Sequence, residues 1–161
     1  LSSLQTYCTW ALMLVTKGRL AIPDLVRAPN AEISRIVAEH SKPQRQMQQA
    51  GSDTDSGFGS QGQYVLQASR AFSKTHSEAT QEEITRLMLT ELDALHGPIP
   101  EILHSQAHRW LHAGIQAPLG KTYLFDRTQG LAAAGDWCTG TTAEDAFISG
   151  SNLAKAIIAG G

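Results

Sequence analysis

An acidic side chain in the last third of the chain stands where it could bind a hydroxylated ligand. The small-residue apolar run "LAAA" (131–134) predicts a strand, and it ends in Gly135 and Asp136. A carboxylate at the end of a sheet strand accepts hydrogen bonds from sugar-like hydroxyls, and a preceding glycine lets the backbone approach the ligand. Asp136 is therefore a candidate binding residue. The alternative is an ordinary turn residue ahead of a helix N-cap.

The residues after this turn predict a helix whose first turn favours negative charge. Thr141 and Glu144 match a capping box at the start of a helical pattern. We expect the amides of Thr142 and Ala143 to be free there, and each interaction with an anion contributes about 0.3 to 1 kcal/mol. Apolar and small residues continue at helical spacing and predict a stripe that packs closely on a sheet: Ala143, Ala146, Phe147, Gly150, Leu153, Ala154, Ile157 and Ile158.

A second nucleotide-binding signature lies in the middle of the chain, but its flanks do not support it. The hexapeptide "GFGSQG" (57–62) matches G-x-G-x-x-G. The fingerprint requires a buried strand entering the glycines and a helix leaving them. Here a polar loop precedes it, and "YVL" (64–66) predicts a strand after it. We therefore predict a flexible loop and assign no function to residues 46–62.

Three histidines, His104, His108 and His112, recur every four residues around Trp110. On a helix this spacing would suggest a metal site, but the segment lacks the glutamate of H-E-x-x-H and any carboxylate between the histidines. We predict a strand and no metal. A strand also places these side chains on one face, because four is a multiple of two. There His108 and Trp110 could shape a substrate site; structural histidines and a core tryptophan are the equal alternative.

Hydrophobic alternation predicts several strands and one long helix. The strand candidates are 10–15, 33–40, 62–69, 105–114 and 122–126. Thr80 and Glu83 match a capping box, and apolar residues at helical spacing follow until Gly97 and Pro98 end the pattern. The mixture predicts an α+β fold.

Composition and charge favour a globular protein and argue against a nucleic-acid-binding or membrane-spanning one. The chain has 161 residues, of which 42% are hydrophobic, enough to bury one core. The net charge of -2 gives no basic surface for nucleic acid, and no apolar run is long enough to span a bilayer. Cys8 and Cys138 form neither a metal motif nor a disulfide framework, so we expect a cytoplasmic protein. The chain opens with Leu1 directly before a strand, and we expect a fragment.

The C-terminal pattern resembles a known flavoprotein family. The segment "AAAGDWCTGTTAEDAFISGSNLAKAI" (132–157) is similar to the closing segment of FAD-dependent amine oxidases and renalase-like flavoproteins. Their pattern is a small-residue strand, Gly-Asp, an aromatic residue and a helix that begins near an acidic pair. Four other segments are similar, in order, to parts of the renalase-like substrate domain: "YCTWALML", "AEHSKPQR", "YVLQASRAFSKTH" and "HRWLHA".

This resemblance implies the C-terminal half of an FAD-dependent oxidoreductase. Residues 1–118 would be part of a mainly antiparallel substrate domain, and 119–161 the last strands and helix of a Rossmann-like FAD-binding domain. Hydride would pass from a dihydronicotinamide-type or amine substrate to FAD and then to dioxygen, giving hydrogen peroxide. His108 and Trp110 would face the substrate. The residues implied at the flavin are Gly135, Asp136, Trp137, Thr142 and Ala143.

The competing class is a small non-catalytic binding or interaction domain without a nucleotide site. The family's own G-x-G-x-x-G would precede Leu1, so the isolated chain is expected to be inactive and colourless. On the residues alone, both classes stay open.

Overall fold

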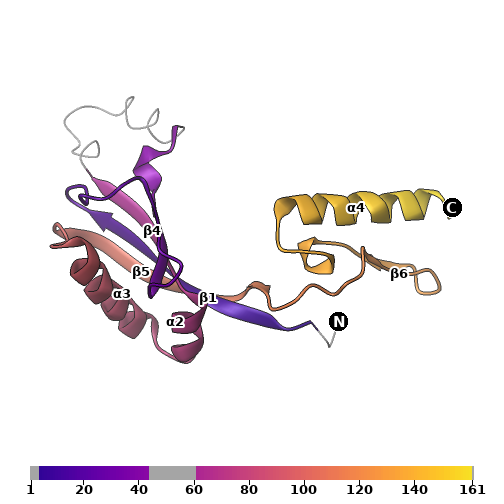
Figure 1. Ribbon diagram of the computed structural model, residues 1–161, viewed down its shortest axis with the longest axis horizontal. Coiled ribbons are helices and arrows are strands. Elements are labelled where there is room, and N and C mark those ends of the chain that lie inside the picture. The colour runs from indigo at the N-terminus through magenta and orange to yellow at the C-terminus, as the bar shows by residue number, and fades with distance from the viewer. Residues whose placement is uncertain (1–3, 44–60, 161) are drawn as a thin grey trace. The chain divides into compact units, whose positions relative to one another are not determined.

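The computed structural model describes residues 4–43 and 61–160 (Figure 1). Its strands are β1 (Thr6–Thr16), β2 (Leu25–Arg27), β3 (Ile33–Ala38), β4 (Gly62–Ala68), β5 (Ile102–Ile115), β6 (Leu124–Asp126) and β7 (Leu131–Ala133). Its helices are α2 (Arg70–Thr75), α3 (Gln81–His96) and α4 (Ala143–Ile158), with short 3-10 turns η1 (Glu39–Ser41) and η3 (Asp136–Cys138).

The chain divides into two units, which we describe separately. The sheet unit is Cys8–Trp110, and the C-terminal unit consists of Leu1–Tyr7 and Leu111–Gly161. The boundary that the resemblance implied, between 118 and 119, lies inside the C-terminal unit.

An antiparallel sheet of five strands, in the order β2-β3-β4-β1-β5, forms the sheet unit. Register aligns Leu12 of β1 with Leu66 of β4, and Leu66 with Ile36 of β3. These three side chains are at most 1% exposed and form one row of the core. Because aligned residues of neighbouring strands point to the same face of a sheet, the three side chains lie together. The predicted α+β class and the predicted strands in this unit are confirmed.

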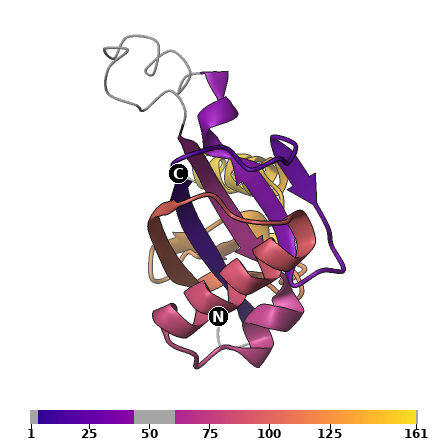
Figure 2. The ribbon, with the colours of Figure 1, turned by 90° about the vertical axis from the view of Figure 1, so that its left-hand side faces the viewer.

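Helices α2 and α3 lie on the face of the sheet that carries this row (Figure 2). Helix α3 buries Ile84, Met88 and Leu92, whose spacing of four places them on one stripe. Thr80 is its N-cap and accepts a hydrogen bond from the Glu83 amide at 3.2 Å. Gly97 ends the helix with φ of 82°, a left-handed value that favours glycine. The predicted long helix is confirmed.

The short helix α2 was not predicted, and its Ser73 ties it to the sheet. Ser73 is fully buried, and its Oγ accepts a hydrogen bond from the Trp10 amide at 3.1 Å. The Trp10 indole nitrogen donates to the His76 carbonyl at 2.9 Å. These bonds satisfy polar groups that burial would otherwise leave unpaired.

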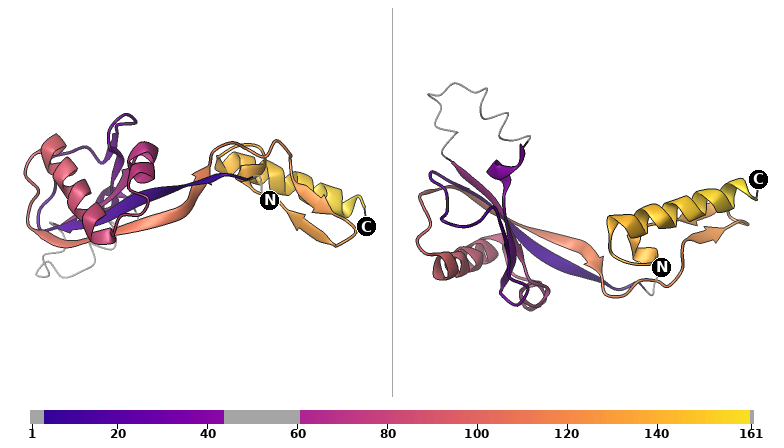
Figure 3. Two further views of the ribbon diagram at one scale, coloured as in Figure 1. Left: turned by 90° about the horizontal axis from the view of Figure 1, so that it is seen from below. Right: turned by 45° about the horizontal axis from the view of Figure 1, so that its top comes forward.

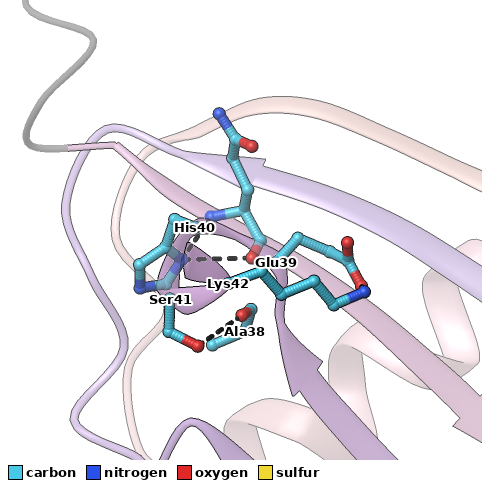
Figure 4. A network of polar contacts seen from close by, with 6 residues as sticks. Ala38, Glu39, His40, Ser41 and Lys42 are labelled. Carbon is cyan, nitrogen blue, oxygen red and sulfur yellow. Dashed lines mark hydrogen bonds and ion pairs between the residues drawn. The ribbon is translucent and has the colours of Figure 1, made fainter. Parts of the chain in front are cut away.

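The end of β3 is fastened to the start of β4 through His40 (Figure 4). His40 is 5% exposed, and its Nδ1 lies 3.1 Å from both the amide nitrogen and the carbonyl oxygen of Gln63. Its ring meets the Tyr64 ring edge-on, with centroids 5.2 Å apart. Around it, Ser41 Oγ donates to the Ala38 carbonyl at 2.8 Å. The histidine therefore has a structural role in the sheet.

Replacing Tyr64 with Phe should destabilise the sheet unit and weaken its response to alkaline pH. The Tyr64 hydroxyl accepts a hydrogen bond from the buried Leu20 amide at 2.7 Å, so Tyr64→Phe should cost about 1 to 3 kcal/mol. Burial raises the pKa of the Tyr64 phenol, against the opposing effect of the Leu20 amide. The folded state thus holds this proton more tightly, and the contribution present below about pH 10 is lost as pH rises through the folded pKa.

Urea unfolding between neutral and alkaline pH measures this effect. Wild type should lose more stability above pH about 10 than Tyr64→Phe does. Tyr123→Phe, in the other unit, is the control. Equal alkaline losses in wild type and Tyr64→Phe would refute the assignment.

The C-terminal unit contains the ends of β1 and β5, the turn η3, a hairpin and one long helix (Figure 3). Strands β6 and β7 pair antiparallel, with Phe125 opposite Ala132. The Asp126 carboxylate accepts from the Thr128 hydroxyl at 2.6 Å in the connecting turn, and this bond is the main cause that lowers its pKa. Helix α4 runs along the hairpin, where the Arg127 guanidinium donates to the Ala156 carbonyl at 3.2 Å. The predicted strands 122–126 and 131–134 are confirmed in shortened form.

The expected apolar stripe of α4 is not buried within this unit. Phe147 is 74% and Ile158 81% exposed, whereas Ser149 is fully buried. The face of α4 around Ser149 is covered by Thr122 and by the Gly135-Asp136 turn, with which Ser149 is hydrogen-bonded through Gly135, and the stripe is left open. None of the helices in residues 4–43 and 61–160 combines the length and apolarity needed to cross a bilayer.

Candidate functional site

The Gly135-Asp136 turn opens onto a cavity of about 420 Å³ in the C-terminal unit. Both sides of the cavity come from residues of this unit. Asp136, Trp137 and Thr141 line one side, and the ends of β1 and β5 form the other with Thr6, Tyr7 and His112. Of the five residues that the resemblance implied at the flavin, Asp136 and Trp137 line this cavity, and the opposite wall was not predicted.

Hydrogen bonds fix the backbone of the turn. The Gly135 amide donates to Ser149 Oγ at 3.1 Å, and that hydroxyl donates to the Thr122 carbonyl at 2.6 Å. A Cβ on Gly135 would overlap the indole Nε1 of Trp137. Glycine is therefore required here by the close approach of the Trp137 ring.

The chain before the hairpin also supports this turn. The Leu119 amide donates to the Trp137 carbonyl and the Gly120 amide to the Cys138 carbonyl, both at 3.0 Å. Cys138 is fully buried between these segments. The loop at 119–120 therefore helps to hold η3 in place.

One carboxylate oxygen of Asp136 is bonded within the protein, and the other is available to a ligand. Asp136 is half-buried, and one carboxylate oxygen accepts from the Trp137 amide at 2.9 Å. The residues that the structure describes donate no hydrogen bond to the second oxygen. Because an ionised carboxylate accepts several hydrogen bonds, Asp136 can also bind a hydroxyl in the cavity.

Helix α4 begins one residue later than the sequence predicted. Thr142 is the N-cap, and Asp145 instead of Glu144 completes the capping box. Asp145 Oδ2 accepts from the Thr142 hydroxyl at 2.6 Å and from the Thr142 amide at 3.0 Å, bonds that lower the pKa of this carboxyl. The expected free amide of Thr142 is therefore wrong. Ala143 is the first residue of α4, and its amide has no partner within the helix.

Sequence reasoning missed the opposite wall of the cavity. Thr6 Oγ1 lies 3.0 Å from His112 Nδ1, and the Tyr7 ring lies where a Cβ on Gly114 would be. His112 entered the prediction only as part of the histidine series. No local pattern marks these residues, because only the pairing of β1 with β5 brings positions 106 residues apart into contact.

The predicted substrate residues belong to the sheet unit. His108 and Trp110 are exposed, and their rings meet edge-on with centroids 4.8 Å apart. Ala107 is buried and Arg109 lies over the Trp10 ring at 5.7 Å, so alternation places His108 and Trp110 on the opposite face of the sheet. Trp110 is 58% exposed, which contradicts the alternative of a core tryptophan.

The histidine series lies on strand β5, which confirms the predicted strand. Among residues 4–43 and 61–160, no three His, Cys, Asp or Glu side chains are grouped so that they could hold a metal ion.

Most of the hexapeptide "GFGSQG" falls outside the described residues. Its last glycine, Gly62, is the first residue of β4, so the strand predicted after the hexapeptide is confirmed.

Substituting Ser149 should loosen the Gly135-Asp136 turn. Ser149→Ala leaves the Gly135 amide and the Thr122 carbonyl without their shared partner, and we expect a loss of about 1 to 3 kcal/mol. Thermal unfolding measures it, with Ser151→Ala on the same helix as control. If both variants melt like wild type, Ser149 does not hold the turn.

No family model matches the chain.

Proposed function

We propose that the Gly135–Ala143 region binds the flavin of a renalase-like FAD-dependent oxidoreductase. The observation that carries the proposal is the Asp136 carboxylate, which has an oxygen available in a cavity of about 420 Å³. Ribityl hydroxyls match such an acceptor, and the glycine before it makes room for the Trp137 ring. The strand, turn and helix order at residues 131–158 supports the same interpretation.

The start of α4 contributes less to this binding than the sequence suggested. The Ala143 amide remains available to an electron-rich edge of the flavin, and the helix dipole favours negative charge there. The Asp145 carboxylate already accepts the hydrogen bond of the Thr142 amide, and it places a negative charge beside the start of the helix. We therefore infer that Asp136 makes the principal contact, while Gly135 and Trp137 shape the approach to it.

The residues around Asp136 suit the ribityl part of FAD. The pyrophosphate would need a separate strand-turn-helix to bind it. When bound, FAD would accept a hydride from the substrate and return electrons to dioxygen, giving hydrogen peroxide. The open apolar face of α4, with Phe147 and Ile158, suits packing on the remainder of a Rossmann-like sheet. In this proposal that sheet belongs to the same cytoplasmic enzyme.

The substrate would lie on the face of the sheet unit that carries His108 and Trp110. Met13, Val65 and Val37 are aligned across β1, β4 and β3 on the face away from α3. An apolar strip with an exposed indole suits a planar dihydronicotinamide ring or the apolar part of an amine. His108 holds the indole edge-on and so positions it.

Anaerobic mixing tests the proposed reaction. We expect the complete product of the gene to carry FAD, and its flavin absorbance to bleach when a dihydronicotinamide or an amine is added. Admission of dioxygen should restore the absorbance with release of hydrogen peroxide. Failure of every compound of both classes to bleach bound flavin would refute the oxidase assignment.

Replacing Trp110 should weaken substrate binding in that enzyme. Loss of an aromatic contact worth about 0.5 to 1.5 kcal/mol predicts that Trp110→Ala raises KM about twofold to tenfold. The control is His104→Ala, another exposed residue of β5. Unchanged KM in the Trp110 variant would remove this residue from the substrate site.

A further inference from the structure

Two arginines lie directly opposite each other on neighbouring strands of the sheet unit. The register of β2 and β3 aligns Arg27 with Arg35. Next to them, the Ala28 amide donates to the Ser34 carbonyl at 2.9 Å. Hydrogen-bonded and non-hydrogen-bonded pairs alternate along an antiparallel ladder. Arg27 and Arg35 therefore form a non-hydrogen-bonded pair, the kind in which the two side chains are closer together.

Both arginine side chains lie on the face of the sheet away from α2 and α3. Ile36, the next residue of β3 after Arg35, is 1% exposed and belongs to the same core cluster as Ile84 of α3. Since successive side chains of a strand point to opposite faces, Arg35 points away from that core. Arg27 points the same way because it is aligned with Arg35. Both residues are exposed to solvent.

Neither guanidinium is neutralised by a carboxylate of the described residues. Among residues 4–43 and 61–160, no ion pair includes Arg27 or Arg35. Like charges directly opposite each other destabilise the pairing of two strands. A bound anion would remove this repulsion, so the arrangement favours an anionic ligand.

A polar side chain and an apolar strip border the arginine pair. Gln67 of β4 is aligned with Arg35, and within the described part of the chain its side-chain amide has no hydrogen-bond partner. Two residues further along the strands, Leu25 is aligned with Val37, and Val37 with Val65. These three side chains lie on the same face as the arginines, and Leu25 is 46% exposed. The basic pair thus adjoins apolar surface.

We propose that Arg27 and Arg35 bind the phosphate group of a small organic phosphomonoester. Guanidinium groups donate paired hydrogen bonds to phosphate oxygens, and two of them balance the charge of about −2 that a phosphomonoester carries near neutral pH. The Gln67 amide would donate to a further oxygen. The apolar or aromatic part of the ligand would lie on Leu25 and Val37.

An anionic membrane suits this face less well than a single phosphate group. Basic segments that bind anionic lipids gather about four to eight lysines or arginines. Here the row contains two arginines, and the chain as a whole has a net charge of -2. The charge of the pair matches one phosphomonoester.

Calorimetric titration of the 161-residue chain with phenyl phosphate at neutral pH and constant ionic strength tests the proposal. This probe carries one phosphomonoester and one aromatic ring. We expect inorganic phosphate to bind more weakly, because it lacks the apolar contact. Benzoate has the ring but a single negative charge, and should bind at least about tenfold more weakly than phenyl phosphate.

Substitutions of the pair identify the site. Arg27→Ala and Arg35→Ala should each weaken phenyl phosphate binding by about tenfold or more. Arg35→Lys keeps the charge but loses the paired donors, and should bind with intermediate affinity. Arg86→Ala is the matched control, because Arg86 of α3 is also exposed and also forms no ion pair with a described residue. It should bind like wild type.

A measurement on wild type does not depend on the folding of any variant. In a nitrogen-proton correlation spectrum, the side-chain Nε–H signals of Arg27 and Arg35 should shift as phenyl phosphate is added. The corresponding signal of Arg86 should stay in place.

Three results would overturn the proposal: no binding of phenyl phosphate at millimolar concentration, equal affinity in wild type and both alanine variants, or unchanged Nε–H signals of the pair. Sedimentation with phosphatidylserine vesicles, lost in Arg35→Ala and without any response to phenyl phosphate, would also overturn it, because the pair would then bind a membrane surface. None of these outcomes depends on flavin binding, since Arg27 and Arg35 belong to the sheet unit.

Discussion

Leu66→Ala should lower the free energy of unfolding of the sheet unit by about 2 to 5 kcal/mol. Leu66 is fully buried in the central strand β4, between Leu12 of β1 and Ile36 of β3. Truncation removes apolar burial and leaves a cavity that strands on both sides keep open. Since domains of this size are stable by about 5 to 15 kcal/mol, the variant loses a large share of its stability.

Urea denaturation followed by far-ultraviolet circular dichroism measures this loss. Leu25→Ala is the matched control, because Leu25 is 46% exposed on the edge strand β2 and should change stability by about 0.5 kcal/mol at most. Equal losses in the two variants would contradict the assignment of the core to the row through Leu66.

Asp136→Ala should weaken FAD binding by about 5-fold to 150-fold in the complete product of the gene. The estimate follows from about 1 to 3 kcal/mol for a charge-assisted hydrogen bond to a ribityl hydroxyl. The variant also removes the acceptor of the Trp137 amide, so the melting temperature of the apoprotein must be compared with that of wild type.

Two further variants separate binding from folding. Asp136→Asn keeps an oxygen that can accept from Trp137 but loses the charge, and should bind FAD with intermediate affinity. Asp93→Ala, an exposed acid on α3, should bind like wild type. Full FAD affinity in Asp136→Ala would remove Asp136 from the flavin site.

The elements with strong periodicity could be predicted from the sequence. Alternation marks β4, where Tyr64 and Leu66 are buried, and helical spacing marks α3 through Ile84 and Met88. Strand β2 was missed because its three residues, Leu25–Arg27, are too few to show a period and depend on pairing with β3. Helix α2 was missed for the same reason, since its six residues carry no amphipathic repeat.

The position of the α4 cap could not be read from the sequence. Two overlapping pairs, Thr141 with Glu144 and Thr142 with Asp145, have the spacing of a capping box. Only the path of the backbone after η3 selects the second pair. The consequence matters for function, because that selection makes the Thr142 amide unavailable to a ligand.

The candidate site was predictable on one side only. Gly135, Asp136 and Trp137 follow a recognisable strand-to-turn pattern, and two of them, Asp136 and Trp137, line the cavity. That they bind a flavin stays a prediction. Tyr7 and His112 carry no such pattern, since their position depends on strand pairing over a long separation. Long-range pairing of this kind leaves no local signal in a single sequence.

Hydrogen exchange of the complete gene product, with and without FAD, tests whether the Gly135–Ala143 region binds the flavin. We expect the purified protein to be yellow and FAD to slow exchange at the amides of 135–143, with the effect reduced in Asp136→Ala. A colourless protein that takes up no FAD at micromolar concentration, or FAD binding that leaves exchange at 135–143 unchanged, would contradict it. Either result would favour a non-catalytic binding domain or a flavin site elsewhere in the chain.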